Sequence, residues 1–360
     1  MKKASYFLTT LCTLVLRAGE ANERISLLEQ QMDQVYTDTV RDTFGAKTAS
    51  ARPQIDSYGV YVSADALYWK AFEGGTDYLM KVKAINSVIA PGPIVGHSII
   101  PEFNWQWGFR TELGYRTAHD DWDIAAHFTW FYDKANSTVN APAGEQLFSL
   151  FFQPMPLPLT LTDATSDLWL HFYDGDLCLQ KSYFLSHNFS ITSLAALRTT
   201  WINQKAHTLT SGNIPSGRVI NLDLSEKSDF WGIGPKIGFS PRWFIGPHWN
   251  IFGAFAASLL YGEFDVRSKT LFVGQELGNP HDNFHQIVPT AQGSLGFGWE
   301  TNSYCNQYHI AINVTYEAQY WWRQNQWFSY SSSANPTMIL KRLGGDLGLQ
   351  GLTLNALFDF

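Results

Sequence analysis

Apolar and polar side chains alternate along this chain over stretches much longer than an ordinary strand. In one of them, Trp105, Trp107 and Phe109 lie on one face of an extended chain, and Arg110 and Glu112 lie on the other. Strands of soluble sheets usually have about 5 or 6 residues, whereas about 9–11 residues cross a bilayer. Such long alternation indicates strands with one face toward hydrocarbon and the other toward a polar interior. The same pattern recurs in residues 122–132 and 309–323.

The composition supports this interpretation. Charged residues make up only 16% of the chain and aromatic residues 15%, against about 25% charge in a soluble domain. The mean hydropathy of −0.15 is nevertheless too low for a bundle of membrane helices. After the N-terminus, the longest apolar stretch is Phe252–Tyr261, and a spanning helix needs roughly 20 apolar residues. A closed β-barrel fits both observations, because only alternate residues face lipid.

We predict ten strong strands, joined alternately by long and short connections. Outer-membrane barrels have short periplasmic turns and long outside loops, so an even number of strands places both ends of the barrel in the periplasm. Short apolar pieces in the loops, such as Tyr78–Val82, could raise the number to 12 or 14. The fold class is therefore all-β, a single antiparallel transmembrane barrel in the bacterial outer membrane, surrounded by outer-membrane lipid. The predicted strands are residues 58–71, 101–117, 120–135, 164–184, 187–204, 227–240, 247–265, 285–300, 307–324 and 345–360.

The residues before the barrel have a different texture. Lys2 and Lys3 precede an apolar run, Tyr6–Leu16, and small residues follow up to Ala21. This order is typical of a secretory signal peptide, which we place at residues 1–21.

Residues 22–57 are expected to form a short amphipathic helix, about Asn22–Phe44, and a linker before the barrel at 58–360. The helix has three interpretations: a small coiled coil joining subunits of a homo-oligomer, a periplasmic arm, or a plug in the barrel.

The end of the chain carries a signal of its own. Phe358 and Phe360 fall on the apolar face of the last predicted strand, and the sequence stops on Phe360. Closing strands of bacterial barrels commonly end on an aromatic residue that the barrel assembly machinery reads. We therefore predict that Phe360, with Phe358, forms the membrane-insertion signal.

The polar faces of the strands provide the candidate functional residues. Both signs of charge occur there, so opposed charges could line a pore and sort small hydrophilic solutes. Alternatively, the charges pair across the interior and fill it, which leaves a structural or adhesive barrel contacting host or envelope partners through loops such as 136–163 and 266–284. A barrel of eight strands is filled by side chains, whereas 16 to 18 strands leave a channel. The candidate pore-lining residues are Asp65, Arg110, Glu112, Asp123, His127, Arg198, Lys236, Glu317 and Arg323.

Other functions find little support. The net charge is −7 and no basic stripe occurs, so we expect no nucleic-acid partner. The ten histidines show no metal-type spacing, and we predict no metal, no cofactor and no enzyme activity. Beyond the leader, which would carry Cys12, two cysteines remain. Cys178 and Cys305 could form one disulfide, or stay as buried thiols.

Several local motifs resemble a known family. In their order along the chain, they are similar to the Legionella-type major outer membrane protein family, which also occurs in chlamydia-related bacteria. The resemblance covers about residues 58–360 and implies a surface-exposed, pore-forming barrel that is not an enzyme. The most specific motif is FWGIGPKIG at Phe230–Gly238. The other motifs are Asp65–Ala71, Trp107–Arg110, Leu113–Arg116, Trp201–Lys205, Leu259–Gly262 and Leu352–Phe360.

Overall fold

A ring of ten antiparallel strands, closed on itself, is the main feature of the computed structural model within the residues that it describes. These residues are 59–83, 96–117, 122–141, 145–149, 152–153, 160–186, 188–213, 219–245, 248–303, 308–332 and 338–359. The predicted signal peptide, the helix, the linker, Cys305 and Phe360 lie outside them. Among the described residues, no helix is long and apolar enough to span a membrane.

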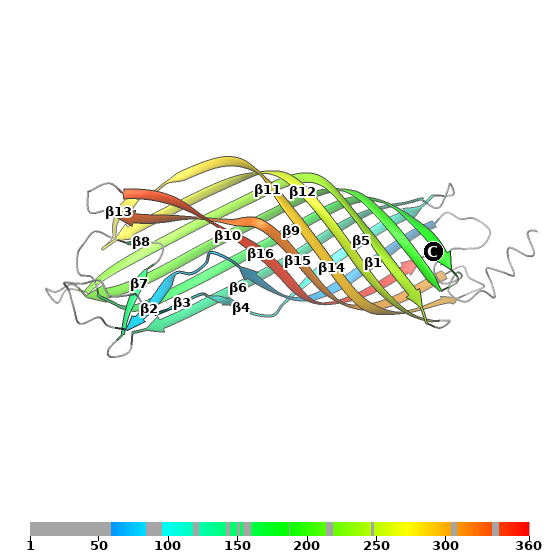
Figure 1. Ribbon diagram of the computed structural model, residues 1–360, viewed down its shortest axis with the longest axis horizontal. Coiled ribbons are helices and arrows are strands. Elements are labelled where there is room, and N and C mark those ends of the chain that lie inside the picture. The colour runs from blue at the N-terminus through cyan, green and yellow to red at the C-terminus, as the bar shows by residue number, and fades with distance from the viewer. Residues whose placement is uncertain are drawn as a thin grey trace, which may run out of the picture.

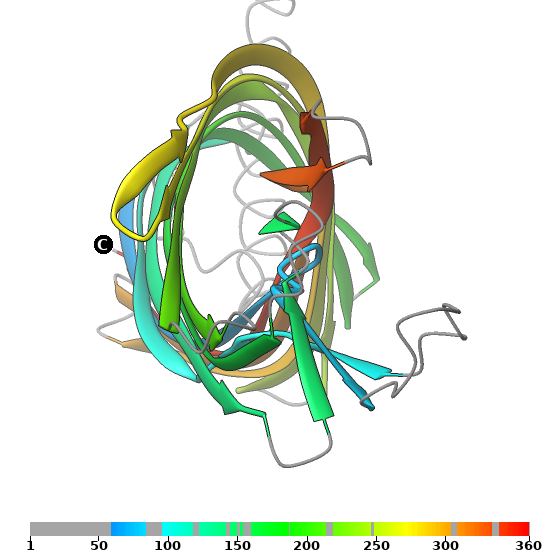
Figure 2. The same ribbon diagram turned by 90° about the vertical axis from the view of Figure 1, so that its left-hand side faces the viewer.

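The ring strands are long and strongly tilted, and they enclose an oval cross-section (Figures 1 and 2). Their order around the ring is β1 (Gly59–Glu73), β5 (Gln106–Arg116), β6 (Trp122–Asn140), β9 (Thr160–Ser186), β10 (Phe189–Asn213), β11 (Val219–Phe244), β12 (Trp249–Phe272), β14 (His281–Ser303), β15 (Tyr308–Ser332) and β16 (Met338–Asp359), and β16 pairs again with β1.

All ten predicted ring strands are confirmed, and within the described residues no further hairpin enters the ring. The apolar piece at Tyr78–Val82 overlaps β2 (Leu79–Lys83), which pairs with β3 (Gly96–Ile99) and β7 (Glu145–Ser149) instead of ring strands. The strands outside the ring path are β2, β3 (Gly96–Ile99), β4 (Glu102–Phe103), β7 (Glu145–Ser149), β8 (Phe152–Gln153) and β13 (Gln275–Gly278).

Several strands continue into regions that the sequence predicted as long loops. β10 runs on from Gln204 to Asn213, and β12 runs on from Val266 to Phe272. The barrel therefore extends well past the apolar part of its wall at the end opposite the short turns, which we call the outer end. The short turns join residues 117–122, 186–189, 244–249 and 303–308, at the end where the C-terminus is marked (Figure 1).

The outward face carries the apolar belt that lipid requires. Aromatic side chains near the outer end of the belt form a row across neighbouring strands, because Trp130 pairs with Tyr173, Tyr173 with Trp201, and Trp201 with Trp231. Near the short turns, the exposed aromatic side chains include Tyr115, Tyr183, Trp243, Trp249, Tyr308 and Phe358. Two aromatic girdles around an apolar band are the signature of a transmembrane barrel.

Candidate functional site

The side chains that point into the barrel form three successive layers along its axis. Alternation puts Asp65, Leu67, Trp69 and Glu73 of β1 on the inner face, in this order toward the outer end. β9 repeats the order with Asp176 and Phe172. A charged layer therefore lies nearer the short turns, and an apolar layer lies beyond it.

Arg110 joins three strands of the charged layer. Its Nη2 atom lies 2.9 Å from Oε1 of Glu317 on β15, and its Nη1 atom lies 3.3 Å from Oδ2 of Asp65 on β1. The Nε atom donates a hydrogen bond of 3.2 Å to Oγ1 of Thr129. Asn355 completes the group by donating from Nδ2 to Oδ1 of Asp65 at 2.5 Å. These contacts satisfy the guanidinium on both edges, as a buried arginine requires.

A second group surrounds Arg198. Its Nε and Nη2 atoms donate to the two carboxylate oxygens of Asp176 at 2.8 and 2.9 Å, and Nη2 also lies 3.1 Å from Asp174. The Nζ atom of Lys236 donates to Asp176 Oδ2 at 2.6 Å. Arg198 further donates to Oε1 of Gln292 at 3.0 Å, on a strand three places away in the ring. Both cations are therefore matched by buried acids.

Glu112 and His127 form a smaller pair, with Glu112 Oε1 3.1 Å from His127 Nε2. Cys178 is a buried thiol, and the disulfide that the sequence left open involves Cys305, which lies outside the described residues. Atoms of His127, Asp176 and Cys178 lie within 4.8 Å of one another, a spacing that could hold a metal ion. However, Arg198 and Lys236 already place two positive charges on Asp176, and this arrangement disfavours a metal cation.

The interior has room for water on the short-turn side. One cavity of about 320 Å³ reaches from the Arg110 group toward the short turns, and its lining includes Asp123 and His309. A second cavity, of about 240 Å³, lies around Arg198, and Arg110, Glu112 and Glu317 line both cavities. We call these adjoining spaces the vestibule. Its walls carry both signs of charge.

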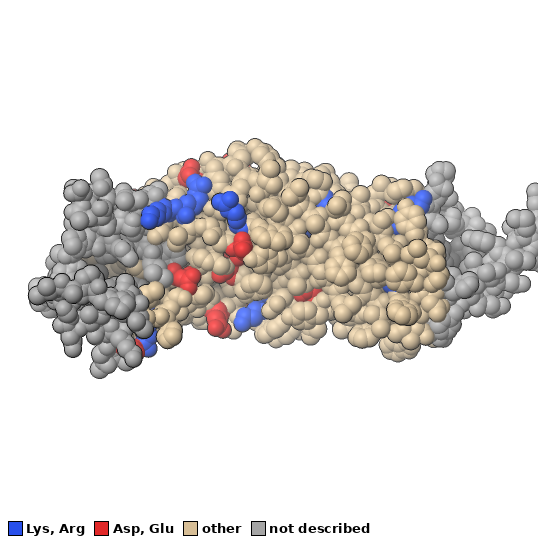
Figure 3. Space-filling view, in the orientation of Figure 1, with Lys and Arg blue, Asp and Glu red and all other residues tan. Residues whose placement is uncertain are grey.

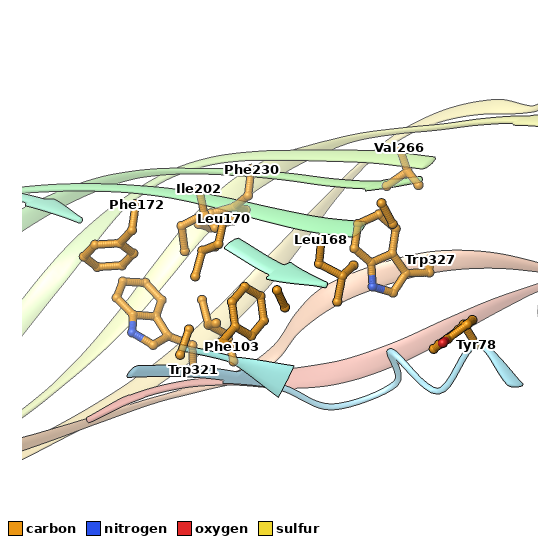
Figure 4. Packing of buried hydrophobic residues seen from close by; sticks show 14 of the residues in the cluster. Tyr78, Phe103, Leu168, Leu170, Phe172, Ile202, Phe230, Val266, Trp321 and Trp327 are labelled. Carbon is orange, nitrogen blue, oxygen red and sulfur yellow. The ribbon is translucent and has the colours of Figure 1, made fainter. Parts of the chain in front are cut away.

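An apolar layer crosses the barrel interior on the outer side of the vestibule. Phe172 of β9 and Trp321 of β15 come from opposite walls of the ring, yet their ring centroids lie 5.5 Å apart, edge to face (Figure 4). Both side chains are fully buried. We define the apolar layer by its buried members, which are Leu67, Trp69, Phe131, Leu170, Phe172, Ile202, Phe230, Leu260, Phe264, Val288, Trp321, Leu347 and Leu349.

A third layer, which is polar, lies beyond the apolar one. Glu73, Gln204 and Glu226 are buried there, and side-chain oxygens of all three lack a hydrogen-bond partner among the described residues. The sequence did not single out this layer.

The structure brings eight of the nine predicted pore-lining residues to the inner face, which are Asp65, Arg110, Glu112, Asp123, His127, Arg198, Lys236 and Glu317. Arg323 is the exception. It is exposed and has a positive φ of 54°, at a register shift between Trp321 and Asn325 that interrupts the alternation of β15. The prediction for Arg323 therefore fails, because a bulge breaks the period on which it rested.

The two acids that contact Arg198 were also missed by the sequence prediction. Asp174 and Asp176 lie on either side of Gly175 and share the inner face of β9. The signal was present, since outward Tyr173, Leu177 and Leu179 alternate with them.

Comparisons with known proteins agree with this architecture. The family model described as "Legionella pneumophila major outer membrane protein precursor" matches residues 56–360. No curated protein sequence matches the chain.

Three solved structures of similar fold are distant in sequence. The outer membrane protease OmpT from Escherichia coli has 10% identity and a TM-score of 0.44, with 84% of this chain and 96% of that chain covered. The toluene transporter TbuX from Ralstonia pickettii has 11% identity and a TM-score of 0.28, with 89% and 97% covered. The toluene transporter TodX from Pseudomonas putida has 9% identity and a TM-score of 0.29, with 89% and 92% covered.

The presence of a protease among these structures overturns the expectation that the chain is not an enzyme, and that expectation is withdrawn. Likenesses this weak carry no argument for a protease or transporter activity here.

The family match extends over the whole described barrel, and the closed ring with its apolar belt is what a strand-built membrane protein requires. The protein is an outer-membrane β-barrel, and it belongs to the Legionella major outer membrane protein family.

Proposed function

We propose that the protein is a pore-forming barrel for small hydrophilic solutes whose passage is closed, in this conformation, by the apolar layer. The contact between Phe172 and Trp321 carries the proposal, because it joins opposite walls and leaves both rings without exposed surface. Apolar constrictions gate channels by excluding water. Solute would pass only when the two rings separate.

The vestibule supports a role in solute passage. It reaches the charged layer from the short-turn end, which outer-membrane barrels place in the periplasm, and both cations and carboxylates line it. A barrel of ten strands lies near the size at which side chains fill the interior. The expected pore is therefore narrow and selective, unlike the open channel of a larger porin.

Single-channel recording of the refolded protein in planar bilayers tests the proposal. The wild type should show small or infrequent steps. The double variant Phe172→Ala and Trp321→Ala removes the contact and should show steps several-fold larger. The matched control is Phe239→Ala with Phe255→Ala, a ring pair 5.4 Å apart on the outward face, which should behave like the wild type. Large, stable wild-type steps equal to those of the double variant would refute the closed layer.

A second candidate is a non-conducting surface barrel, and the outer end favours it. β10 and β11 continue past the aromatic row to Asn213 and Val219, and charged side chains lie on their outward faces. This extension would project from the membrane and could contact partners. If the Phe172 and Trp321 double variant folds and inserts but never conducts, the surface barrel is the better description.

A further inference from the structure

A groove of about 370 Å³ crosses the outer surface of β10, β11 and β12 beyond the aromatic row. One wall consists of Lys205, Lys227 and Arg267, which pair directly in register across the three strands. The opposite wall, two residues nearer the outer end on each strand, consists of His207, Ser225 and Lys269, and the lining also includes Trp169 and Asn279. Alternation places all of these strand side chains on the outward face.

The register brings like charges together. Lys205 faces Lys227, and Lys227 faces Arg267, although like charges directly opposite one another destabilise a sheet. Neighbouring acids relieve part of the repulsion, since Lys227 pairs with Asp229 and Arg267 pairs with Asp265 at 2.7 Å. Lys205 forms no ion pair with any residue that the structure describes. A bound anion would relieve the remaining repulsion.

The groove itself is lined by cations and by no outward-facing acid. Glu226 contributes to its floor, but this side chain is only 4% exposed and faces the barrel interior. The side chains of Lys227, Arg267 and Lys269 are 41%, 55% and 51% exposed, so a ligand can reach them, although each also pairs with an acid outside the groove lining, Asp229, Asp265 and Glu276 respectively.

The position of the groove along the barrel indicates the kind of anion. Lys205 and Lys227 each lie four residues beyond a girdle tryptophan on the same strand, Trp201 and Trp231 respectively. Four residues of a strand span about 13 Å, and tilt shortens this along the membrane normal. Aromatic girdles mark the membrane interface, so the cations lie at the level of lipid headgroups. Figure 3 shows charged side chains gathered between the uncharged central belt and the outer end.

We propose that this groove binds the phosphorylated headgroup of an anionic lipid in the outer leaflet. The phosphate would lie between Lys205, Lys227 and Arg267, where it neutralises the unpaired Lys205, relieves the remaining repulsion and gains charge-assisted hydrogen bonds. Basic side chains near a membrane surface attract anionic lipids in this way. Lys134 of β6 pairs in register with Trp169 and lies 5.1 Å from its ring, and it also forms an ion pair of 3.3 Å with Asp167.

The test measures binding of fluorescent diphosphorylated lipid A to the full-length barrel in neutral detergent. The triple variant Lys205→Gln, Lys227→Gln and Arg267→Gln should bind at least tenfold more weakly than the wild type. A control variant that removes three cations elsewhere, Lys70→Gln, Lys181→Gln and Lys341→Gln, should bind like the wild type. If the triple variant does not fold, Lys205→Gln alone is informative, since it leaves no acid unpaired and should weaken binding about threefold.

Two further measurements separate the sources of the anion. Chemically dephosphorylated lipid A should bind at least tenfold more weakly than the phosphorylated form, and inorganic phosphate at the same concentration should not displace the lipid. The proposal is overturned if both forms of the lipid bind alike, if the control variant loses as much affinity as the groove variants, or if inorganic phosphate displaces the lipid.

Discussion

The guanidinium of Arg110 on β5 and the carboxylate of Glu317 on β15 meet inside the barrel, with Nη2 2.9 Å from Oε1, although β1 and β16 lie between their strands. Asp65 lies 3.3 Å from the same guanidinium. One cation therefore holds two carboxylates from two other strands. The charged layer is an interlocked structure as well as the wall of the vestibule.

Replacing Arg110 by Met should destabilise the barrel by about 3 kcal/mol, because it leaves two buried carboxylates without their cation. This value is at the lower end of the usual range, since the adjoining cavity can admit water. Urea unfolding in detergent, followed by tryptophan fluorescence, measures the change. The control Arg267→Met alters an exposed ion pair, which solvent screens, and should leave the stability of the barrel nearly unchanged. Equal losses in the two variants would contradict the interlocked layer.

Gly234, in the FWGIGPKIG motif, should not tolerate a side chain. A Cβ atom there would lie 1.9 Å from the carbonyl oxygen of Leu259 on the neighbouring strand, a contact with backbone that cannot move away cheaply. We expect Gly234→Ala to reduce the yield of refolded, heat-modifiable barrel several-fold. Gly293→Ala is the matched control, because its nearest neighbour would be a side-chain atom at 3.6 Å. A full yield of Gly234→Ala would show that the close approach is not required.

The ring strands, and the face of each strand that points outward, follow from local sequence, because one face of each strand must meet hydrocarbon. The alternation of Trp107 and Phe109 with Arg110 survives folding unchanged, as does the inward position of Asp65. Beyond the aromatic row both faces of a strand can be polar, so the signal disappears. For this reason the sequence did not predict the extension of β10 to Asn213.

Contacts between distant strands could not be predicted from a pattern along one strand. The alternation places Phe172 and Trp321 on inner faces, but only the oval closure of the ring brings them 5.5 Å apart. The cationic groove depends likewise on the register that pairs Lys205 with Lys227, which the sequence does not specify. Arg323 illustrates the opposite error, since the periodic pattern was extended through a bulge.

Cys178 should resist thiol reagents in the folded barrel. Its side chain points inward and is only 2% exposed, packed near Ala125 and Tyr61. In a Cys305→Ser background, maleimide labelling of the mature protein should be at least a hundredfold slower when folded than in urea. Fast labelling of the folded protein would mean that the vestibule opens widely enough to admit the reagent, or that this wall of the barrel is not packed as described.

The buried acids of the outer end should make stability depend on pH. Burial is the main cause that raises the pKa of Glu226 from 4.5 to about 8 and that of Glu73 to about 7. Between about pH 4.5 and 8, the folded protein therefore binds more protons than the unfolded chain. The free energy of unfolding falls as pH rises through this window. Above about pH 8 the destabilisation caused by ionised, buried Glu226 is constant. Below the pKa of 4.5 that this side chain has in the unfolded chain, the destabilisation is absent.

The variant Glu226→Gln removes this penalty, so it should be more stable than the wild type at pH 9 and close to it at pH 4. Urea unfolding of both proteins at both pH values gives the difference between their free energies of unfolding. The titration of all other groups cancels in this difference. The control Glu263→Gln changes an exposed acid on the outward face of β12 and should leave the pH dependence of the wild type intact. If Glu226→Gln shows the same loss of stability between pH 4 and 9 as the wild type, Glu226 is hydrated or paired in solution, and the polar layer is open to water rather than sealed within the wall.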